Sequence, residues 1–420
     1  MRRKTLGELW NFWDKAGAGT TELVGMKREE LNRRVPRGER VVICVGCSRL
    51  GDYMHISATP YQMKKIPHLR VVLTPLCNFK CIFCKSGGES GYISQTRMKP
   101  NEIQKIIQIA ADAGLEVLRF TGGEPTLSKN LIPAMKTAKE LGIPKIQLVT
   151  NGSRLEKTVP ALARLDLDNL TVSLESLDHN LYHKIIGRNI LQKIMRRNVL
   201  ERVKKGIKKV HQQGISLRFN MILMQLNIPQ FNNFIEYAGK YEAEVKILDL
   251  LENQVPNQEL WERIYLPTNW LKETQKNPEK RYWITPPGGY GVPMEVLHLP
   301  NGARLIFKDS LNGTHYSSPC KKCLYYPCQD GMYGLWVTHD GKTKICWTNT
   351  CWTNNETVQD MLTPIRQNNY AQAKEVFHNT LKIYKEAKFA QVWQPNLDLK
   401  PLREKYEQTL THLKETAYSF

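Results

Sequence analysis

The sequence predicts an α/β fold whose core is a partial (β/α)6 barrel of the TIM type. Within residues 69–255, six short apolar segments alternate with segments of helical periodicity, which is typical of a parallel sheet covered by helices. Right-handed crossovers would curl such a sheet into a barrel. Polar residues follow the strand segments at or near their C-terminal ends, the side of a barrel that carries its chemistry. We therefore expect the active site at that side.

The strands and helices expected in the barrel alternate along the chain. The strands are expected at 69–76, 115–121, 145–150, 170–174, 217–224 and 245–251. The helices are expected at 101–114 and 131–142, around 159–162, and at 190–214 and 230–241. Gly114 and Gly142 directly follow two of these helical patterns, and glycine is a common residue just past a helix end.

We expect four parts along the chain: an N-terminal extension (1–68), the barrel (69–255), a connector with a cysteine-rich region (256–359) and a C-terminal helical region (360–420). The extension should hold a short helix near 6–13 and a strand at 40–45. Hairpins are expected at 295–307, turning on Asn301-Gly302, and at 334–345, turning on Asp340-Gly341. The tail should be helical over 370–390 and 402–418.

Composition is that of a globular protein. The 420 residues are 41% hydrophobic and 24% charged, and no apolar run approaches the ~20 residues of a membrane span. No secretory signal is evident, so we expect a cytoplasmic location and no membrane partner. The formal net charge is +20, which favours an anionic partner such as a nucleotide, a nucleic acid or an acidic peptide.

Three cysteines, Cys77, Cys81 and Cys84, lie in one short loop after the first strand. Three thiolates at this spacing can ligate three irons of a [4Fe–4S] cluster and leave the fourth iron open for a ligand. Zinc would need a fourth ligand close by, and disulfides would need an oxidising compartment. Cluster ligation is the interpretation that the spacing favours.

A second group of cysteines follows in the connector: Cys320, Cys323, Cys328 and Cys346. The expected hairpin at 334–345 would bring the last of them back beside the first three. Four thiolates can close either a structural zinc site or a second [4Fe–4S] cluster, and spacing does not separate the two. Cys351 is a spare thiol or an alternative ligand. Cys44 and Cys47 are either a redox pair, a metal half-site or two ordinary buried thiols.

The segment Gly122-Gly123-Glu124-Pro125 ends the second strand. Its glycines allow the backbone to approach a ligand without side-chain obstruction, and the Glu124 carboxylate could bind an ammonium group. Asn151 and Ser173 stand at the ends of the next two strands. Together with the cysteine loop, these residues form a candidate site on consecutive strand ends.

The cysteine loop and the glycine segment resemble the radical S-adenosylmethionine (SAM) family over roughly residues 69–252. The resemblance implies a [4Fe–4S] cluster on Cys77, Cys81 and Cys84, and SAM bound to its open iron. It implies that Gly122, Gly123 and Glu124 hold the SAM amino group, with Asn151 and Ser173 near the carboxylate and ribose. It also implies reductive cleavage of SAM to a 5′-deoxyadenosyl radical that abstracts hydrogen from a substrate.

Within this family, segments 173–178, 218–220 and 335–342 resemble the molybdenum cofactor GTP cyclase branch. This resemblance implies an auxiliary [4Fe–4S] cluster on the second cysteine group. It also implies a small anionic, nucleotide- or nucleoside-derived substrate that undergoes rearrangement, cyclisation or C–C bond chemistry. The expected electron donor is a flavodoxin or ferredoxin.

Three other functions stay open from the sequence. The first 68 residues could grip a leader peptide in a peptide-modifying maturase. The positive net charge could serve tRNA modification through salt-sensitive RNA binding. The chain could also be a cluster protein without catalytic activity.

Overall fold

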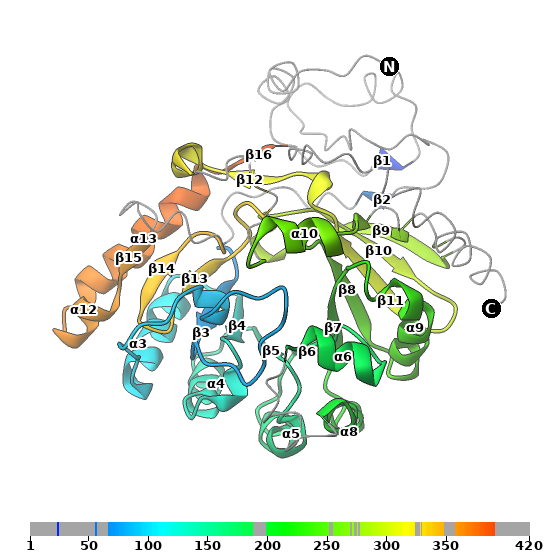
Figure 1. Ribbon diagram of the computed structural model, residues 1–420. Helices are drawn as coiled ribbons and strands as arrows, with labels where there is room; N and C mark the ends of the chain where they lie inside the picture. Colours follow the sequence, from blue (N-terminus) through cyan, green and yellow to red (C-terminus); the bar gives the residue numbers. More distant parts are fainter. Residues whose placement is uncertain are drawn as a thin grey trace, which may run out of the picture.

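The computed structural model describes most of the chain from Ile66 to Ala390 (Figure 1). The described residues are 23–24, 55–56, 66–187, 199–251, 255–268, 271–272, 275, 278–323, 328, 330–347 and 358–390. The expected helices at 6–13 and 402–418, the strand at 40–45 and the thiols of Cys44, Cys47 and Cys351 lie outside them. In the described part, no helix is long and apolar enough to cross a membrane.

Six parallel strands form the centre of the sheet, which confirms the predicted fold class. They are β3 (Leu69–Val72), β4 (Val117–Thr121), β5 (Lys145–Thr150), β6 (Asn169–Ser173), β7 (Leu217–Ile222) and β8 (Glu244–Leu248). Each pairs in parallel with the next in the chain. Figure 1 shows them as an open arc, with helices along its outer side.

The helices lie close to their predicted positions. They are α3 (Pro100–Asp112), α4 (Leu131–Glu140), α5 (Leu155–Ala163), α8 (Val199–Gln212) and α9 (Phe231–Lys240). In α3 the apolar side chains of Ile103, Ile106 and Ile107 recur at helical spacing and are buried against the sheet. Pro100 opens this helix, where its missing N–H costs nothing, and the Glu102 carboxylate accepts the Lys99 N–H at 2.6 Å.

The first strand is shorter than predicted. We expected a strand over 69–76, but β3 ends at Val72. Beyond it the backbone pairs with the loop after β4, because Gly123 N donates to Thr74 O at 2.7 Å and Glu124 N donates to Leu76 O at 2.8 Å. Pro75 also has no N–H to give to a sheet.

The expected hairpins both form, and both extend the barrel sheet. β9 (Lys280–Ile284), β10 (Met294–His298) and β11 (Arg304–Lys308) add to one edge, where β11 runs parallel to β8. β13 (Leu335–Val337), β14 (Lys342–Lys344) and β15 (Val358–Asp360) add to the other, where β13 runs parallel to β3. These additions cover the edges of the parallel sheet.

The short strands β2 (His55–Ile56) and β1 (Leu23–Val24) continue the sheet beyond β9. The other elements lie outside this sheet: the helices α6 (His179–Ile185), α10 (Gln258–Ile264), α12 (Leu362–Arg366) and α13 (Tyr370–Lys385), and the strand pair β12 (Thr314–Tyr316) and β16 (Lys388–Ala390). The expected helix at 370–390 therefore ends at Lys385, and α6 was not predicted. Strands from both sides of the boundary expected at residues 255 and 256 belong to one sheet. The four-part division of the chain stays a prediction.

Candidate functional site

The first cysteine loop follows β3 and is clamped by the end of α6. Lys80 N donates to Ile186 O at 3.0 Å, and Ile82 N donates to Ile185 O at 2.9 Å. Gly187 has φ +56°, and a Cβ there would lie 1.8 Å from Lys80 O. A side chain at position 187 would therefore displace the loop that carries the cysteines.

The three thiols of this loop act on one another electrostatically. Burial raises the pKa of the Cys81 thiol well above its usual value, and Cys84 and Cys77 raise it further. Desolvation by the surrounding loop, together with Cys77, raises the pKa of Cys84 to about 11. Thiolates that disfavour one another in this way ionise when a positively charged metal group neutralises them, and metal binding then releases protons.

These three thiols have the donor chemistry of an iron–sulfur site with an open corner. Within the described ranges, no group of three or more His, Cys, Asp or Glu side chains is arranged to hold a single metal ion. The fit therefore rests on the soft thiolate donors and their mutual proximity. Cys77 and Cys84 are exposed and Cys81 is half-buried, so the loop presents its sulfur atoms at the surface of the site.

Gly122 and Gly123 pack against the cysteine loop. A Cβ on Gly123 would lie 2.5 Å from Leu76 O, and one on Gly122 would lie 2.8 Å from Thr74 O. A Cβ on Gly88, at the end of the same loop, would likewise lie 2.5 Å from Gly122 O. The glycines were expected to allow close approach of a ligand, and the contacts show that they allow close approach of two loops.

Glu124 is fully buried and its carboxylate is held by four donors. Oε1 accepts Thr126 N at 3.1 Å, Thr126 Oγ1 at 2.5 Å and Thr150 Oγ1 at 2.6 Å, while Oε2 accepts Asn151 N at 2.6 Å. Burial raises the pKa of this carboxyl, and the hydrogen bonds oppose that shift. Its contacts join the end of β4 to the end of β5.

Asn151 carries this connection on to the cysteine loop. Its Nδ2 donates to Asn78 Oδ1 at 2.9 Å and lies 3.7 Å from Cys77 Sγ, and its Oδ1 accepts Ser153 N at 2.9 Å. A chain of hydrogen bonds therefore runs from Glu124 through Asn151 to Cys77. The structure thus brings three of the predicted site residues together.

The substitution Glu124→Gln is expected to destabilise the fold by about 2–3 kcal/mol. The new amide NH2 group faces donors and leaves at least one of them unsatisfied. Chemical unfolding under anaerobic conditions measures the loss. The matched control is Glu140→Gln at the exposed end of α4, where less than about 0.5 kcal/mol is expected. A Glu124→Gln protein as stable as its parent would show that the four donors do not need the carboxylate.

Ser173 ends β6 and lies opposite Asn220 of β7 in the parallel register. Neighbours in a parallel pair point to the same face of the sheet. The Oδ1 atom of Asn220 is buried and accepts no hydrogen bond within the described residues. An acceptor left open inside the barrel, beside Ser173, fits a ligand that supplies the missing donor.

The second cysteine group is brought together as well. Cys320 and Cys346 are buried, and Cys323 and Cys328 are half-buried. Burial raises the pKa of the Cys320 thiol, and Cys346 and Cys323 raise it further. Burial and Cys346 likewise raise the pKa of Cys328. All four predicted ligands therefore lie within electrostatic range of at least one other member of the group.

A set of buried and half-buried cations inside the barrel was missed by the sequence-based prediction. These cations, here called the interior cations, are Arg70, Arg119, Arg218, Lys246 and Lys308, on β3, β4, β7, β8 and β11. Burial lowers the pKa of Lys246 well below its usual value. The positive charges of Arg218, Arg119, Lys308 and Arg70 lower it further, in that order. The sequence signal that could have revealed the interior cations is the presence of charged residues within short apolar strand segments.

Most interior cations have a partner in the fold. Arg70 forms an ion pair with Glu89, Arg218 with Glu244 and Lys308 with Asp330, while Arg119 donates to Gln147. Among the described residues, Lys246 forms no ion pair. Positive charge that the fold does not neutralise is a binding site for an anion.

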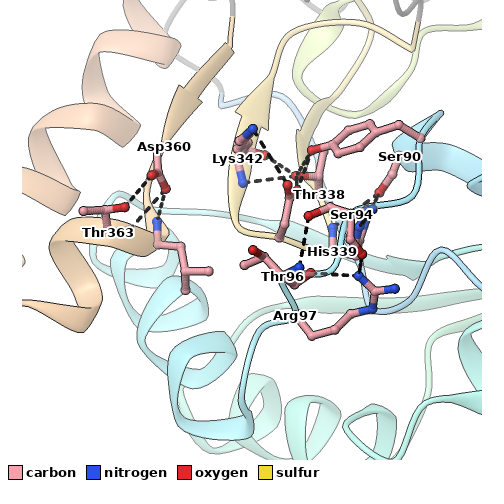
Figure 2. A network of polar contacts seen from close by, with 12 residues as sticks. Ser90, Ser94, Thr96, Arg97, Thr338, His339, Lys342, Asp360 and Thr363 are labelled. Atoms are coloured by element: carbon pink, nitrogen blue, oxygen red, sulfur yellow. Dashed lines mark hydrogen bonds and ion pairs between the residues drawn. The ribbon is translucent and has the colours of Figure 1, made fainter.

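A buried polar network joins the cysteine loop to the β13–β14 hairpin (Figure 2). His339 Nδ1 lies 2.7 Å from Ser90 Oγ, and Ser94 N donates to His339 Nε2 at 3.2 Å. Because Nε2 accepts, the neutral ring carries its proton on Nδ1. Burial lowers the pKa of His339 to about 4.

Acid is therefore expected to weaken the fold through His339. The His339 imidazole gains a proton below about pH 6.5 in the unfolded chain, but only near pH 4 in the folded chain. The stability that its neutral form gives the fold is therefore lost as the pH falls through this range. His339→Gln should remove about 1–3 kcal/mol of the pH dependence between pH 7 and 5. Anaerobic chemical unfolding at several pH values measures it. His378→Gln, on the exposed side of α13, is the control, and identical pH slopes for His339→Gln and the parent would contradict the assignment.

Comparison with known proteins agrees with this geometry. The radical SAM superfamily model matches residues 71–238. A probable GTP 3′,8-cyclase of Thermococcus kodakarensis is 28% identical over 344 residues, which are 77% of this chain and 95% of the relative. One from Sulfurisphaera tokodaii is 35% identical over 190 residues, which are 45% of this chain and just over half, 56%, of the relative.

Among solved structures, native anSMEcpe with bound AdoMet aligns with a TM-score of 0.49 and 12% identity, over 84% of this chain and 99% of that one. The matched superfamily segment contains the cysteine loop, the glycine segment, Asn151 and Ser173. Its cofactors are a [4Fe–4S] cluster and SAM. The chain thus contains a radical SAM domain and is similar to proteins named GTP 3′,8-cyclases.

Proposed function

We propose that this enzyme converts a small anionic, nucleotide-like substrate that binds among the interior cations, between the two cysteine groups. Cys77, Cys81 and Cys84 would hold the [4Fe–4S] cluster. The reduced cluster would supply the electron that cleaves bound SAM, and this cleavage gives the radical that abstracts hydrogen from an unactivated C–H bond. A flavodoxin or ferredoxin would supply the electron.

The chain's own residues would position SAM. The Gly122–Glu124 segment lies directly against the cysteine loop, which suits it to receive the amino group beside the open iron. Asn151 is fixed by Glu124 and reaches the cysteine loop, and Ser173 stands on the next strand. Asn151 and Ser173 would contact the carboxylate and the ribose of SAM.

The second cysteine group would hold an auxiliary [4Fe–4S] cluster. Cys320, Cys323, Cys328 and Cys346 supply four thiolates, as a fully ligated cluster requires. Their backbone supports them as acceptors: Gly331 N donates to Cys328 Sγ at 3.2 Å and Ser317 N donates to Cys320 Sγ at 3.5 Å. A fully ligated cluster would leave substrate recognition to the side chains around it.

The observation that carries the substrate class is the charge of the barrel interior. Arg70 pairs in register with Arg119 on one side and with Trp336 of β13 on the other, so its side chain shares a face with both. Lys246 pairs in register with Asn220 and has only cations among the charged groups that shift its pKa. Phosphate groups would neutralise these charges. The GTP in the names of the relatives makes GTP the first substrate to test.

The test uses the full chain, reconstituted anaerobically with iron and sulfide. It is incubated with SAM, a chemical reductant and one nucleotide at a time from GTP, ATP, CTP and UTP. Mass spectrometry follows 5′-deoxyadenosine and any new nucleotide product. We expect one nucleotide to raise the rate of SAM cleavage and to be consumed with it. Equal rates with and without every nucleotide would exclude this substrate class.

A further inference from the structure

One carboxylate beside the second cysteine group is only half satisfied by the fold. Asp330 is fully buried, and its Oδ1 lies 3.2 Å from Lys308 Nζ. Its Oδ2 is also buried and accepts no hydrogen bond in the part of the chain that the structure describes. Buried polar atoms almost always have a partner, so this oxygen calls for a donor that the described residues do not supply.

The backbone holds Asp330 in this position. Its carbonyl accepts Thr314 Oγ1 at 3.2 Å, and the following Met332 N donates to His315 O at 2.9 Å. Gly331 has φ +62°, and a Cβ there would lie 2.2 Å from Thr314 Cγ2. The segment is therefore pinned onto β12, which fixes the backbone from which the Asp330 carboxylate projects.

Glu89 shows what a satisfied carboxylate in the same region looks like. It also pairs with one interior cation, Arg70, but both of its oxygens are engaged by the guanidinium. Trp336 Nε1 donates to Glu89 Oε2 at 3.1 Å as a further contact. Glu89 is thus fully used by the fold, while Asp330 keeps one oxygen open.

The surroundings of Asp330 belong to the wall of the proposed substrate site. Lys308 Nζ lies 4.3 Å from the centre of the Tyr333 ring. That ring meets Trp336 edge-on at 5.0 Å, and Arg70 lies 5.6 Å from the Trp336 ring. Aromatic rings can stack on a flat base and cations can bind phosphate groups, and the open oxygen of Asp330 is an acceptor at the edge of this wall.

We propose that Asp330 Oδ2 accepts a hydrogen bond from an N–H or O–H group of the substrate and so selects among anionic molecules that the interior cations hold. This inference rests on the proposed anionic substrate and adds a donor group to it. A buried acceptor rejects an analogue without the donor, because the acceptor then stays unpaired. Asp330 is therefore a specificity-determining residue.

The first test is nucleotide binding by the anaerobic, iron-loaded full chain, measured by equilibrium dialysis. The probes are GTP, ATP, purine riboside triphosphate (which lacks the base donors) and 2′,3′-dideoxy-GTP (which lacks the ribose donors). Asp330→Asn should weaken at least one probe by about tenfold or more. For the probe that lacks the N–H or O–H group bound by Asp330, Asp330→Asn should change the affinity by less than about twofold. Asp166→Asn, an exposed aspartate paired with Lys139, is the matched control, and iron content verifies both proteins.

The second test is thermal unfolding of the same proteins without nucleotide. Asp330→Asn leaves Lys308 without its ion-pair partner, but it also removes a buried charge whose Oδ2 has no partner among the described residues, so it should lower Tm by less than Glu89→Gln does. Glu89→Gln should lower Tm strongly, because Arg70 loses a bidentate partner. A fall in Tm for Asp330→Asn as large as that for Glu89→Gln overturns the proposal and makes the residue structural.

The outcomes separate this inference from the proposed nucleotide. Unchanged affinity of Asp330→Asn for every probe that the parent binds overturns the proposal, as expected if only an ordered water contacts Oδ2. If the parent binds none of the probes, the nucleotide class fails. The unfolding comparison then decides alone: a smaller fall in Tm than that of Glu89→Gln supports a donor on a different anionic substrate, and an equal or larger fall overturns the role of Asp330.

Discussion

Replacing Cys77, Cys81 and Cys84 together by alanine is expected to abolish SAM cleavage and to halve the iron content. Two [4Fe–4S] clusters require about eight irons per chain, and the variant should keep about four. The reason is that these three thiols lie within electrostatic range of one another in a loop clamped by α6. Iron and sulfide analysis, with 5′-deoxyadenosine formation under reducing conditions, measures both effects.

The matched control is the double variant Cys320→Ala and Cys323→Ala. It should also lose about four irons, yet retain SAM cleavage, because the first loop is untouched. If the triple variant kept its full iron content and its SAM cleavage, the cluster would not reside on Cys77, Cys81 and Cys84. Zinc in place of iron on the second group would refute the auxiliary cluster and leave the first assignment standing.

The substitution Lys246→Met is expected to weaken nucleotide binding by about tenfold to a hundredfold while stabilising the nucleotide-free protein. Its amine is half-buried, forms no ion pair in the described part of the chain and lies close enough to four other cations for them to lower its pKa. Removing it relieves repulsion in the free enzyme and removes a charge-assisted contact to phosphate. Equilibrium dialysis and thermal unfolding measure the two opposite changes.

Lys145→Met is the control for Lys246→Met. Lys145 also lies on a barrel strand, at the exposed start of β5, and its removal should change neither affinity nor Tm beyond error. If Lys246→Met lost stability and kept its affinity, the interior cations would be structural. The positive charge of the interior cations would then no longer support an anionic substrate.

Local sequence patterns were sufficient for the central strands. β5 has the predicted bounds, because an alternating apolar segment between a glycine-ended helix and Asn151-Gly152 leaves little freedom. The cysteine loop was equally readable, since three thiols within eight residues define a metal site by spacing. The Gly122–Pro125 segment was recognisable because it directly follows a strand.

Pairing between distant segments was not readable in this way. The parallel pairing of β11 with β8 and of β13 with β3 joins residues far apart in sequence, and a hairpin pattern says nothing about its next neighbour. The contacts of Glu124 were also beyond the sequence, because its donors come from Thr126, Thr150 and Asn151 in two different loops. In the sequence Arg70 and Lys246 are isolated charges. Only the pairing of the strands shows that they lie on one face of the sheet.

The pairing of β13 with β3 has a further consequence. The first cysteine loop follows β3 and Cys346 follows β14, so both are attached to one run of hydrogen-bonded strands, β3–β13–β14. The sheet would therefore set the distance between the two cysteine groups, and with it the length of substrate that fits between them.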